Sequence, residues 1–269
     1  MNKSSPKVLL FIPTFQCQDQ IQRVLLKIST EIQKEIELIL LVDNISKDKT
    51  IENAILRSEQ IQSCKFLILR NKENYGLGGS HKIAFRYALE NEFDYILVLH
   101  GDDQANIKDA INLLNNKLYL NFDCYLGSRF MRDSKLIGYS VFRKVGNFIF
   151  NKLFSILVGQ NIFDLGSGLN MYRLKAFKNG EFMQYPDDLV FNYVMLLNSC
   201  IKKQSIHFFP ISWTEEDQLS NVKFVSHCLK VLHIWITCLF NKKKFTHRKW
   251  TSRKKIEYES LEIFSSGLT

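Results

Sequence analysis

The stretch ILVLHGDDQ, residues 96–104, decides the predicted fold, because an apolar run ends abruptly there in acidic and amide side chains. The apolar part is typical of a strand buried in a parallel sheet. In an open α/β sheet, ligands bind at the carboxyl ends of such strands. Two carboxylates and an amide oxygen at this point suit a hard divalent cation that also holds a diphosphate. The alternative is a strand that simply ends in a polar turn.

Predicted strands and helices alternate along the first part of the chain. Apolar patterns indicate buried strands at residues 8–12, 36–42, 65–69 and 95–99, and helices at 20–33, 48–60 and 80–90. This order predicts an α/β protein with a mainly parallel sheet and helices on both faces. The later pattern is less regular, with helices expected at 107–119, 143–158, 189–200 and 229–240, and strands at 124–130 and 207–213.

The composition indicates one large domain with a basic C-terminal end. Of 269 residues, 46% are hydrophobic, and the net charge is +9. Eight Lys and Arg residues lie within 241–255, where no residue is acidic. Such a block suits nucleic acid, anionic lipid, or a solvated and partly disordered tail. The apolar segment 229–240 precedes it directly, so this segment is either an interfacial helix on anionic lipid or a final helix packed on the domain.

The cysteine pattern and the N-terminus indicate where the protein works. The six cysteines are scattered without a C-x-x-C pair, which favours reduced thiols in the cytosol. Residues 1–7 are polar, and no apolar run reaches the roughly 18–20 residues that span a bilayer. We therefore expect a cytoplasmic protein, soluble or peripheral on the inner face of the membrane. Nucleic acid is not expected as a partner, because the basic block lies outside the aromatic-bearing domain.

Asp43 follows the predicted strand at 36–42 and is a candidate ligand-binding residue. Its carboxylate can accept a hydrogen bond from a nucleobase imide or a ribose hydroxyl. Helix capping is the structural alternative in this loop, and we assign it to Ser46 and Asp48.

Two glycine-containing loops are further candidates. The loop NYGLGG, residues 74–79, would let the backbone approach a ligand closely, but it has neither Walker nor G-x-G-x-x-G spacing. Asp164, with Gly166 and Gly168, suits an acceptor pocket. A plain turn explains either loop nearly as well.

Two arginines and one histidine flank the acidic stretch. Arg129 and Arg143 could neutralise a phosphate, although a lone arginine is usually an ordinary surface residue. His100 ends a buried strand, a position that favours hydrogen-bonded scaffolding over a catalytic base.

Six short motifs follow one another along the chain, and their order is informative as well as their residues. They are Pro13-Thr14-Phe15-Gln16, Asp43-Asn44-x-Ser46-x-Asp48-x-Thr50, Asn74-x-Gly76-x-Gly78-Gly79, Gly101-Asp102-x-Gln104, Gly127-Ser128-Arg129 and Asp164-x-x-Ser167-Gly168. Together they resemble family 2 glycosyltransferases of the GT-A fold. The branch they resemble is that of dolichyl-phosphate mannosyltransferase and bacterial polyprenyl-phosphate glycosyltransferases. The resemblance covers roughly residues 7 to 225. It implies a Rossmann-like GT-A domain at 1–225, followed by a C-terminal amphipathic helix and basic tail at 226–269.

The resemblance implies a nucleotide-sugar donor, a Mg²⁺ or Mn²⁺ ion on its diphosphate, and inversion at the anomeric carbon. Asp43 matches the base-binding aspartate, and Asp102 and Gln104 match the metal motif. The expected catalytic set is Asp102, Arg129, Asp164 and Asp188. The other expected substrate contacts are Pro13, Asn74, Gly76, Gly78, His100, Arg143 and Lys223.

Three positions depart from the family pattern. His100 stands where the first aspartate of the metal motif is expected, and Asn44 replaces the second aspartate of the base-binding pair. Asp217 stands six residues before Lys223, where the branch carries an arginine for phosphate. An acidic residue there would repel a lipid phosphate.

The sequence thus predicts an inverting transferase that moves a sugar from a nucleoside-diphosphate sugar to a polyprenyl phosphate or a cell-envelope glycan. One alternative is transfer to a soluble or protein-linked glycan hydroxyl, which needs a carboxylate base such as Asp164 or Asp188. The other is a non-catalytic sugar-nucleotide-binding protein, a hypothesis that His100 and Asn44 motivate.

Overall fold

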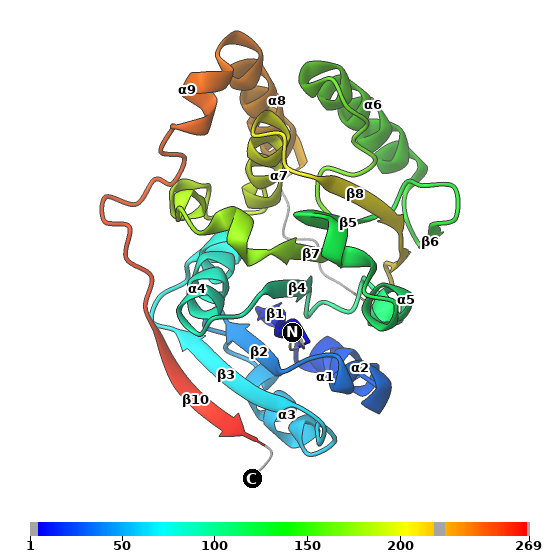
Figure 1. The fold of residues 1–269 in the computed structure, drawn as a ribbon, viewed down its shortest axis with the longest axis vertical. Helices are drawn as coiled ribbons and strands as arrows, with labels where there is room; N and C mark the ends of the chain where they lie inside the picture. Colours follow the sequence, from blue (N-terminus) through cyan, green and yellow to red (C-terminus); the bar gives the residue numbers. More distant parts are fainter. Residues whose placement is uncertain (1–4, 218–223, 268–269) are drawn as a thin grey trace.

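The computed structural model describes residues 5–217 and 224–267. Eight strands form one mixed sheet in the order β10-β3-β2-β1-β4-β7-β5-β8 (Figure 1). Their bounds are β1 Val8–Thr14, β2 Leu38–Asp43, β3 Lys65–Asn71, β4 Tyr95–Leu99, β5 Cys124–Ser128, β7 Leu169–Arg173, β8 Ile206–Pro210 and β10 Ser260–Ser266. A small second sheet pairs β6 (Lys135–Ile137) with β9 (Ser212–Thr214) in parallel.

The predicted parallel core is confirmed. Strands β3, β2, β1 and β4 are mutually parallel, and each was predicted from its apolar run. Beyond them, β7 is antiparallel to both β4 and β5, and β10 is antiparallel to β3. The carboxyl ends of β1, β2 and β4 therefore meet at one edge of the sheet, where the candidate site residues follow the strands.

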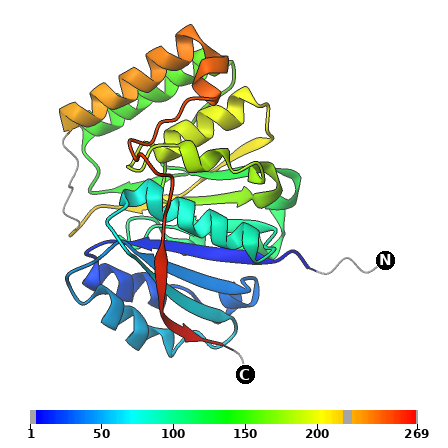
Figure 2. The ribbon, with the colours of Figure 1, turned by 90° about the vertical axis from the view of Figure 1, so that its left-hand side faces the viewer.

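Helices cover both faces of the sheet, as Figures 1 and 2 show. Their bounds are α1 Gln18–Leu26, α2 Thr30–Lys34, α3 Thr50–Ser58, α4 Gly76–Glu90, α5 Ile111–Asn115, α6 Val141–Val158, α7 Phe191–Ile201, α8 Phe224–Phe240 and α9 Lys242–Thr246. Side chains of β1 alternate between two buried clusters: Leu9 and Phe11 pack with α4 and α7, whereas Leu10 and Ile12 pack with α1, α3 and α5. The predicted α/β class is confirmed.

Two helical predictions differ from the structure. The helix expected at 20–33 is two helices, because α2 has its own N-cap at Ser29, whose hydroxyl accepts a hydrogen bond from the Ile32 N–H. The helix expected at 107–119 is the short α5 between two 3₁₀ turns, Ile107–Ala110 and Leu118–Asn121.

The C-terminal end returns to the sheet after the two last helices. Residues 247–259, here called the C-terminal segment, run from α9 along the side of the molecule to β10, which pairs with β3 as an edge strand (Figure 2). The backbone N–H groups of Trp250 and Thr251 both donate to the Gln184 carbonyl on the way. Part of the predicted basic tail is thus a strand of the main sheet, and the domain boundary at residue 225 stays a prediction. Within residues 5–217 and 224–267, no helix has both the length and the apolar character needed to cross a bilayer.

Candidate active site

The ends of β1, β2 and β4 are held together by short backbone contacts. The Gly101 N–H donates to the Pro13 carbonyl over 3.1 Å, and the Asn44 N–H donates to the Thr14 carbonyl over 2.9 Å. A Cβ atom on Gly101 would lie only 2.7 Å from the Thr14 methyl carbon, so this approach requires glycine. The structure therefore brings Pro13, Asp43 and residues 100–104 to one edge, as the sequence predicts.

Asp43 is fully buried at the end of β2, and one of its oxygens lacks a partner. Oδ2 accepts a hydrogen bond from the Ser46 N–H at 3.0 Å and lies 3.6 Å from Arg70 Nε. Among the described residues, nothing donates to Oδ1. Burial raises the pKa of this carboxyl, against the hydrogen bonds from Ser46 and the charge of Arg70. An unsatisfied buried acceptor costs about 1–3 kcal/mol, so a hydrogen-bond donor on a ligand would remove a real penalty here.

The capping prediction is wrong for Ser46, and Asp48 contacts α3 from the position before its N-cap, which is Lys49. The Ser46 hydroxyl accepts from the Gln16 N–H, not from helix α3. Asp48 Oδ1 accepts from the Thr50 N–H at 3.1 Å, in the first turn of α3. Both side chains thus stabilise the loop around Asp43.

Asn44 explains one departure from the family pattern. Its Oδ1 accepts from the Tyr75 N–H at 2.8 Å and from Asn71 Nδ2 at 2.9 Å, while its Nδ2 donates to Asn74 Oδ1 at 2.8 Å. A carboxylate could not donate that last bond. The amide therefore ties β2, β3 and the glycine loop into one frame beside Asp43.

The glycine loop forms the first turn of α4 and packs against the chain itself. Gly76 has φ +69°, and a Cβ there would lie 2.3 Å from the Asp187 carbonyl oxygen. A Cβ on Gly78 would lie 2.2 Å from the Pro186 carbonyl oxygen, and the Gly78 N–H donates to the Asp187 carbonyl at 2.8 Å. The close approach that these glycines allow is therefore filled by the backbone of residues 186–187, where we expected a ligand. Substrate contact at Asn74, Gly76 and Gly78 stays a prediction.

A buried lysine holds this loop to the C-terminal segment. The Lys82 ammonium, on α4, donates to Asp187 Oδ1 at 2.5 Å, to the Tyr258 hydroxyl at 2.8 Å and to the Tyr185 carbonyl at 2.6 Å. Burial lowers the pKa of Lys82 to about 8, although Asp187 opposes the shift. Thr251 also donates to Asp187. Sequence reasoning missed this cluster, because a lysine inside a predicted helix carries no signal that it is buried.

The acidic stretch after β4 divides its side chains between two tasks. Asp103 has φ +60° and pairs with α1, at 2.8 Å from Arg23 Nε and 2.5 Å from Lys27 Nζ. Asp102 is half-buried, and its Oδ1 accepts from the Gln104 N–H at 3.2 Å. Burial raises the pKa of Asp102 to about 6. Asp102 and Gln104 are thus the residues of this stretch that fit a cation, whereas Asp103 is structural.

His100 packs as a neutral ring against the loop that carries Gly168. The backbone N–H of His100 donates to the Gly168 carbonyl at 2.9 Å, and a Cβ on Gly168 would lie 3.1 Å from the imidazole ring. Burial, together with the nearby charge of Arg129, lowers the pKa of His100 to about 4. Its buried Nε2 has no hydrogen-bond partner among the described residues. The scaffolding role is consistent with this packing, and substrate contact through Nε2 stays a prediction.

The donor set at this edge fits a cation that is held mainly by a ligand. Within the described parts of the chain, no group of three or more His, Cys, Asp or Glu side chains could hold a metal ion. Asp102 and Gln104 offer one carboxylate and one amide oxygen. Mg²⁺ is commonly bound by one or two carboxylates, with waters and substrate phosphates completing the octahedron. The residues therefore suit a cation that arrives with a diphosphate.

Arg129 and Asp164, both predicted to be catalytic, are paired with each other. Arg129 Nε and NH2 donate to the two Asp164 oxygens at 2.8 Å each, and its NH2 also reaches the Gly166 carbonyl at 2.8 Å. The guanidinium lies 4.9 Å from the centre of the Trp213 ring. Burial would lower the pKa of Arg129, but the charge and hydrogen bonds of Asp164 outweigh it and raise the pKa above its usual range. The arginine fork is thus engaged within the protein, and the catalytic roles of both residues stay predictions.

The remaining candidates lie on other elements. Arg143, on α6, pairs with Glu215 at 2.5 Å. Asp188 accepts from the Val190 N–H and pairs with Lys230 of α8 at 2.5 Å. It lines a cleft of about 760 Å³ with Asn74, between the glycine loop, α8 and the C-terminal segment. Lys223 lies outside the described residues.

Acidic and amide side chains at the carboxyl ends of parallel strands are the pattern of α/β proteins that bind a ligand at the sheet edge. A family model described as "Glycosyl transferase family 2" matches residues 10–180 of this sequence. The match covers more than half of the chain, and the chain belongs to this family.

Two curated relatives are similar in sequence. An uncharacterized protein of Methanocaldococcus jannaschii is 27% identical over 172 residues, which are 64% of this chain and 67% of that protein. The undecaprenyl-phosphate mannosyltransferase of Micrococcus luteus is 26% identical over 167 residues, 62% of this chain and 66% of the enzyme. The aligned part thus spans about two thirds of each relative.

Solved glycosyltransferase structures share the fold. The glucosyl-3-phosphoglycerate synthase of Mycobacterium tuberculosis, in complex with UDP, has a TM-score of 0.61 at 10% identity, over 87% of this chain and 80% of that chain. The mannosyltransferase PcManGT of Pyrobaculum calidifontis, in complex with GDP-Man and Mn²⁺, has a TM-score of 0.60 at 13% identity, over 89% and 64%. At these identities, the likeness establishes the architecture.

Proposed function

We propose that this chain transfers a sugar, with inversion, from a nucleoside-diphosphate sugar to a polyprenyl phosphate or another membrane-associated glycan acceptor. The observation that carries the proposal is the unpartnered Asp43 Oδ1, buried at the strand edge where Asp102 and Gln104 also lie. The imide N–H of a nucleobase could donate the hydrogen bond that this oxygen lacks. Family membership and the nucleotide complexes of structural neighbours support the same donor class.

Each residue at the edge has a proposed role. Asp43 would orient the base, with Asn44 and Asn74 holding the surrounding loop in place. Asp102 and Gln104 would hold Mg²⁺ or Mn²⁺ on the donor diphosphate. When bound, such a cation would neutralise the charge that develops on the departing nucleoside diphosphate.

The ion pairs at the site favour a phosphate acceptor over a hydroxyl. A hydroxyl acceptor needs a general base, whereas a phosphate is already anionic. Asp164 is engaged by Arg129, and Asp188 by Lys230, so both candidate bases are neutralised by a cation. The Micrococcus luteus relative, named as an undecaprenyl-phosphate enzyme, supports the same acceptor class. Arg143 and Lys223 remain proposed contacts for the phosphate.

The test is transfer from UDP- and GDP-sugars, with Mg²⁺ or Mn²⁺, to polyprenyl phosphate or to a glycan hydroxyl. We expect transfer to polyprenyl phosphate, an inverted anomeric configuration in the product by NMR, and near wild-type turnover in Asp188→Asn. Loss of turnover in Asp188→Asn, with donor binding intact, would favour the hydroxyl acceptor. If the protein neither transfers nor hydrolyses any donor, the result would favour a non-catalytic binding protein.

A further inference from the structure

Helix α6 carries apolar side chains on two faces. Phe154 and Leu157 are buried in the core, as expected of a helix packed on a sheet. The outer face is also apolar. Six of its residues are 51–73% exposed: Val141, Phe142, Val145, Phe148, Ile149 and Ile156. A surface helix normally turns polar residues to the solvent, so a row of exposed apolar side chains on the outer face lacks an explanation within the described chain.

Helix α8 repeats the arrangement. Val231, Ile234 and Cys238 are buried, whereas 40–81% of each residue is exposed in a second row formed by Leu229, Leu232, Ile236, Leu239 and Phe240. Their spacing of three to four residues places them along one stripe of the helix. The sequence predicted an apolar helix here, but it gave no indication that α6 would add a second stripe.

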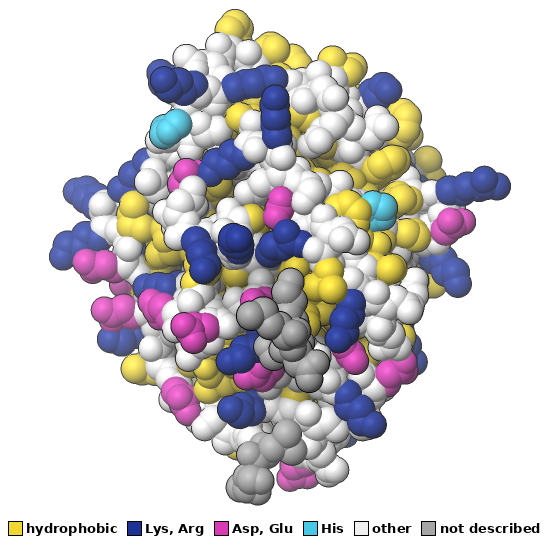
Figure 3. Space-filling model, viewed as in Figure 1, with side chains coloured by type: hydrophobic (Ala, Val, Ile, Leu, Met, Phe, Trp, Pro, Cys, Tyr) yellow, Lys and Arg dark blue, Asp and Glu magenta, His cyan; other side chains and the backbone are white. Residues whose placement is uncertain are grey.

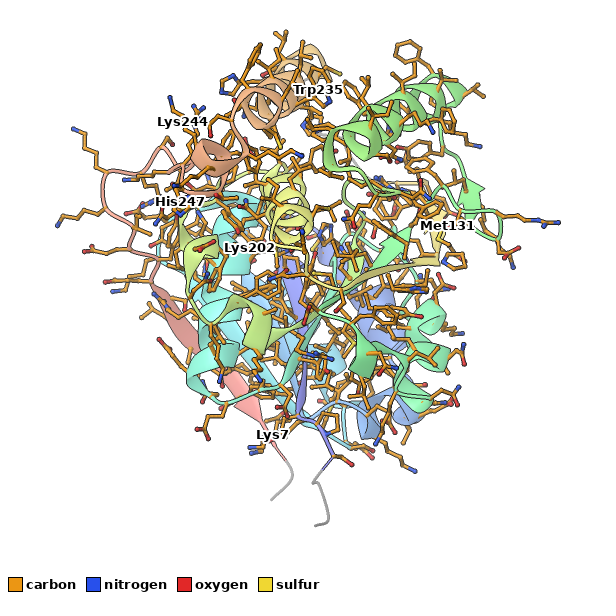
Figure 4. All side chains as sticks on the ribbon, turned by 45° about the horizontal axis from the view of Figure 1, so that its top comes forward. Lys7, Met131, Lys202, Trp235, Lys244 and His247 are labelled. Carbon is orange, nitrogen blue, oxygen red and sulfur yellow. The ribbon has the colours of Figure 1, made fainter. Side chains whose placement is uncertain are left out.

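The two helices lie side by side at one end of the molecule, opposite β10 (Figures 1 and 2). Trp235 of α8, labelled in Figure 4, donates its indole N–H to the Leu153 carbonyl of α6 at 3.2 Å. Figure 3 shows apolar side chains at this end, next to Lys and Arg. We call the exposed apolar residues of α6 and α8 together the α6–α8 face.

The sequence around this face contains positive charges and no negative ones. Residues 141–163 contain three Lys or Arg, and residues 224–246, which form α8 and α9, contain four; neither segment has an Asp or a Glu. These segments therefore carry a formal charge of +7, of which Arg143 and Lys230 are paired with Glu215 and Asp188. Lys242, Lys243 and Lys244, directly after Phe240, are all exposed.

We infer that the α6–α8 face docks on an anionic lipid surface, with both apolar stripes in contact with the lipid. Apolar side chains beside a cationic block are the pattern of helices that lie in a membrane interface. Each Lys or Arg near an anionic leaflet adds about 1 kcal/mol of attraction. Charge also decides between lipid and a second copy of this chain, because two faces with this excess of positive charge would repel each other. The inference holds whether or not the chain is a transferase.

The experiment measures binding of the full chain to vesicles of phosphatidylcholine, with or without phosphatidylglycerol, by sedimentation. The test variant is Phe142→Ser/Phe148→Ser on α6, where the two side chains are 71% and 68% exposed. The control is Leu26→Ser/Leu56→Ser, at 52% and 58% exposed on α1 and α3, away from the α6–α8 face (Figure 1). Both variants remove two exposed apolar side chains, so neither should disturb the core.

We expect wild type and control to bind the anionic vesicles equally, with an affinity that falls as salt is added. The α6 variant should bind about tenfold to a hundredfold more weakly, since each buried Phe contributes a large transfer free energy. Equal binding by the α6 variant would overturn the inference. The inference would also be overturned if the wild-type protein did not bind vesicles and instead formed a dimer that the α6 variant cannot form. Because the readout is sedimentation, its failure is independent of any result on sugar transfer.

Discussion

Two carboxylates at the sheet edge have opposite surroundings. Asp164 is neutralised by a bidentate arginine, whereas Asp102 has its pKa raised to about 6 by burial. Burial disfavours the charged form of Asp102, so this carboxylate does not serve stability. Such a residue is a candidate for a functional role. Asp102 is therefore the residue at which stability and function should conflict.

We expect Asp102→Asn to stabilise the protein at pH 7 by about 1–3 kcal/mol. The folded-state pKa of about 6 lies above the unfolded value of 3.8, so the unfolded state releases its proton first. Stability is therefore lost as pH rises through this window, and the full cost is present above about pH 6. Urea unfolding across this pH range measures the effect, and the advantage of the variant should vanish below the unfolded pKa.

Asp19→Asn, on the exposed start of α1, is the matched control and should change stability by less than about 0.5 kcal/mol. Added Mn²⁺ or Mg²⁺ with a nucleoside diphosphate should stabilise wild type but not Asp102→Asn. A variant that is less stable than wild type at pH 7 would refute this description of the site.

A second prediction concerns the buried ion pair. Asp164→Asn should lower the free energy of unfolding by about 3–5 kcal/mol, because it leaves the Arg129 guanidinium buried without its counter-charge. Asp188→Asn is the control, since its partner Lys230 is exposed and the pair should contribute at most about 1 kcal/mol. Denaturant unfolding measures both. Equal, small losses would show that Asp164 is not a structural residue and would strengthen its catalytic assignment.

At single positions, the sequence predicted where polar side chains lie better than which residues they pair with. Asp43 and Asp102 could be placed at this edge because Asp43 ends β2 and Asp102 follows β4 after two residues, and strand ends are placed by the sheet; their roles stay predictions. The pairing of Arg129 with Asp164 joins residues 35 positions apart, and the sequence offers no rule for it. The ion pairs of Asp103 could not be predicted for the same reason, since its partners Arg23 and Lys27 lie 80 and 76 positions earlier in the chain.

Among the elements, the C-terminal segment is the one that reaches the candidate site from far along the chain. Its Tyr258 hydroxyl contacts both Lys82 and Asp187, and the Asp187 carbonyl accepts from the Gly78 N–H of the glycine loop. The segment thus supports the loop beside Asn74.

Tyr258→Phe should therefore lower stability by about 1–3 kcal/mol, because it removes a partner from the buried Lys82 ammonium. The readout that separates this from a general loss of packing is hydrogen exchange, which should accelerate at residues 76–79 and 247–259 before the rest of the sheet. Tyr87→Phe on α4, a partly exposed tyrosine, is the control. Uniform acceleration across the whole sheet would contradict a local supporting role.

The elements themselves were predictable to the extent that their patterns were local. The four parallel strands were found because each is a continuous apolar run buried on both faces. Strand β10 was missed because it is an edge strand whose Leu261 and Ile263 are exposed, and its pairing with β3 joins residues about 190 positions apart. The break between α1 and α2 was missed, although Ser29 offered a capping signal.

At the scale of the whole molecule, the two proposed functional surfaces adjoin at one cleft, where Leu229 of the α6–α8 face lies with Asn74 and Asp188. The edge formed by β1, β2 and β4 holds the candidate donor site, and the α6–α8 face lies at one end of the molecule (Figure 2). An enzyme that acts on a lipid-linked acceptor needs both, one to bind a water-soluble donor and one to hold it at the membrane.

The most direct test of the donor site is calorimetric titration of UDP- and GDP-sugars, with Mn²⁺, into wild type, Asp43→Asn and the same-loop control Asp48→Asn. We predict that wild type binds at least one donor. Asp43→Asn should bind it about tenfold to a hundredfold more weakly, because the buried Oδ1 acceptor is a charged hydrogen-bond partner for the base. Asp48→Asn should keep wild-type affinity, since its carboxylate serves Thr50. Equal donor affinity in wild type and Asp43→Asn would contradict the central claim.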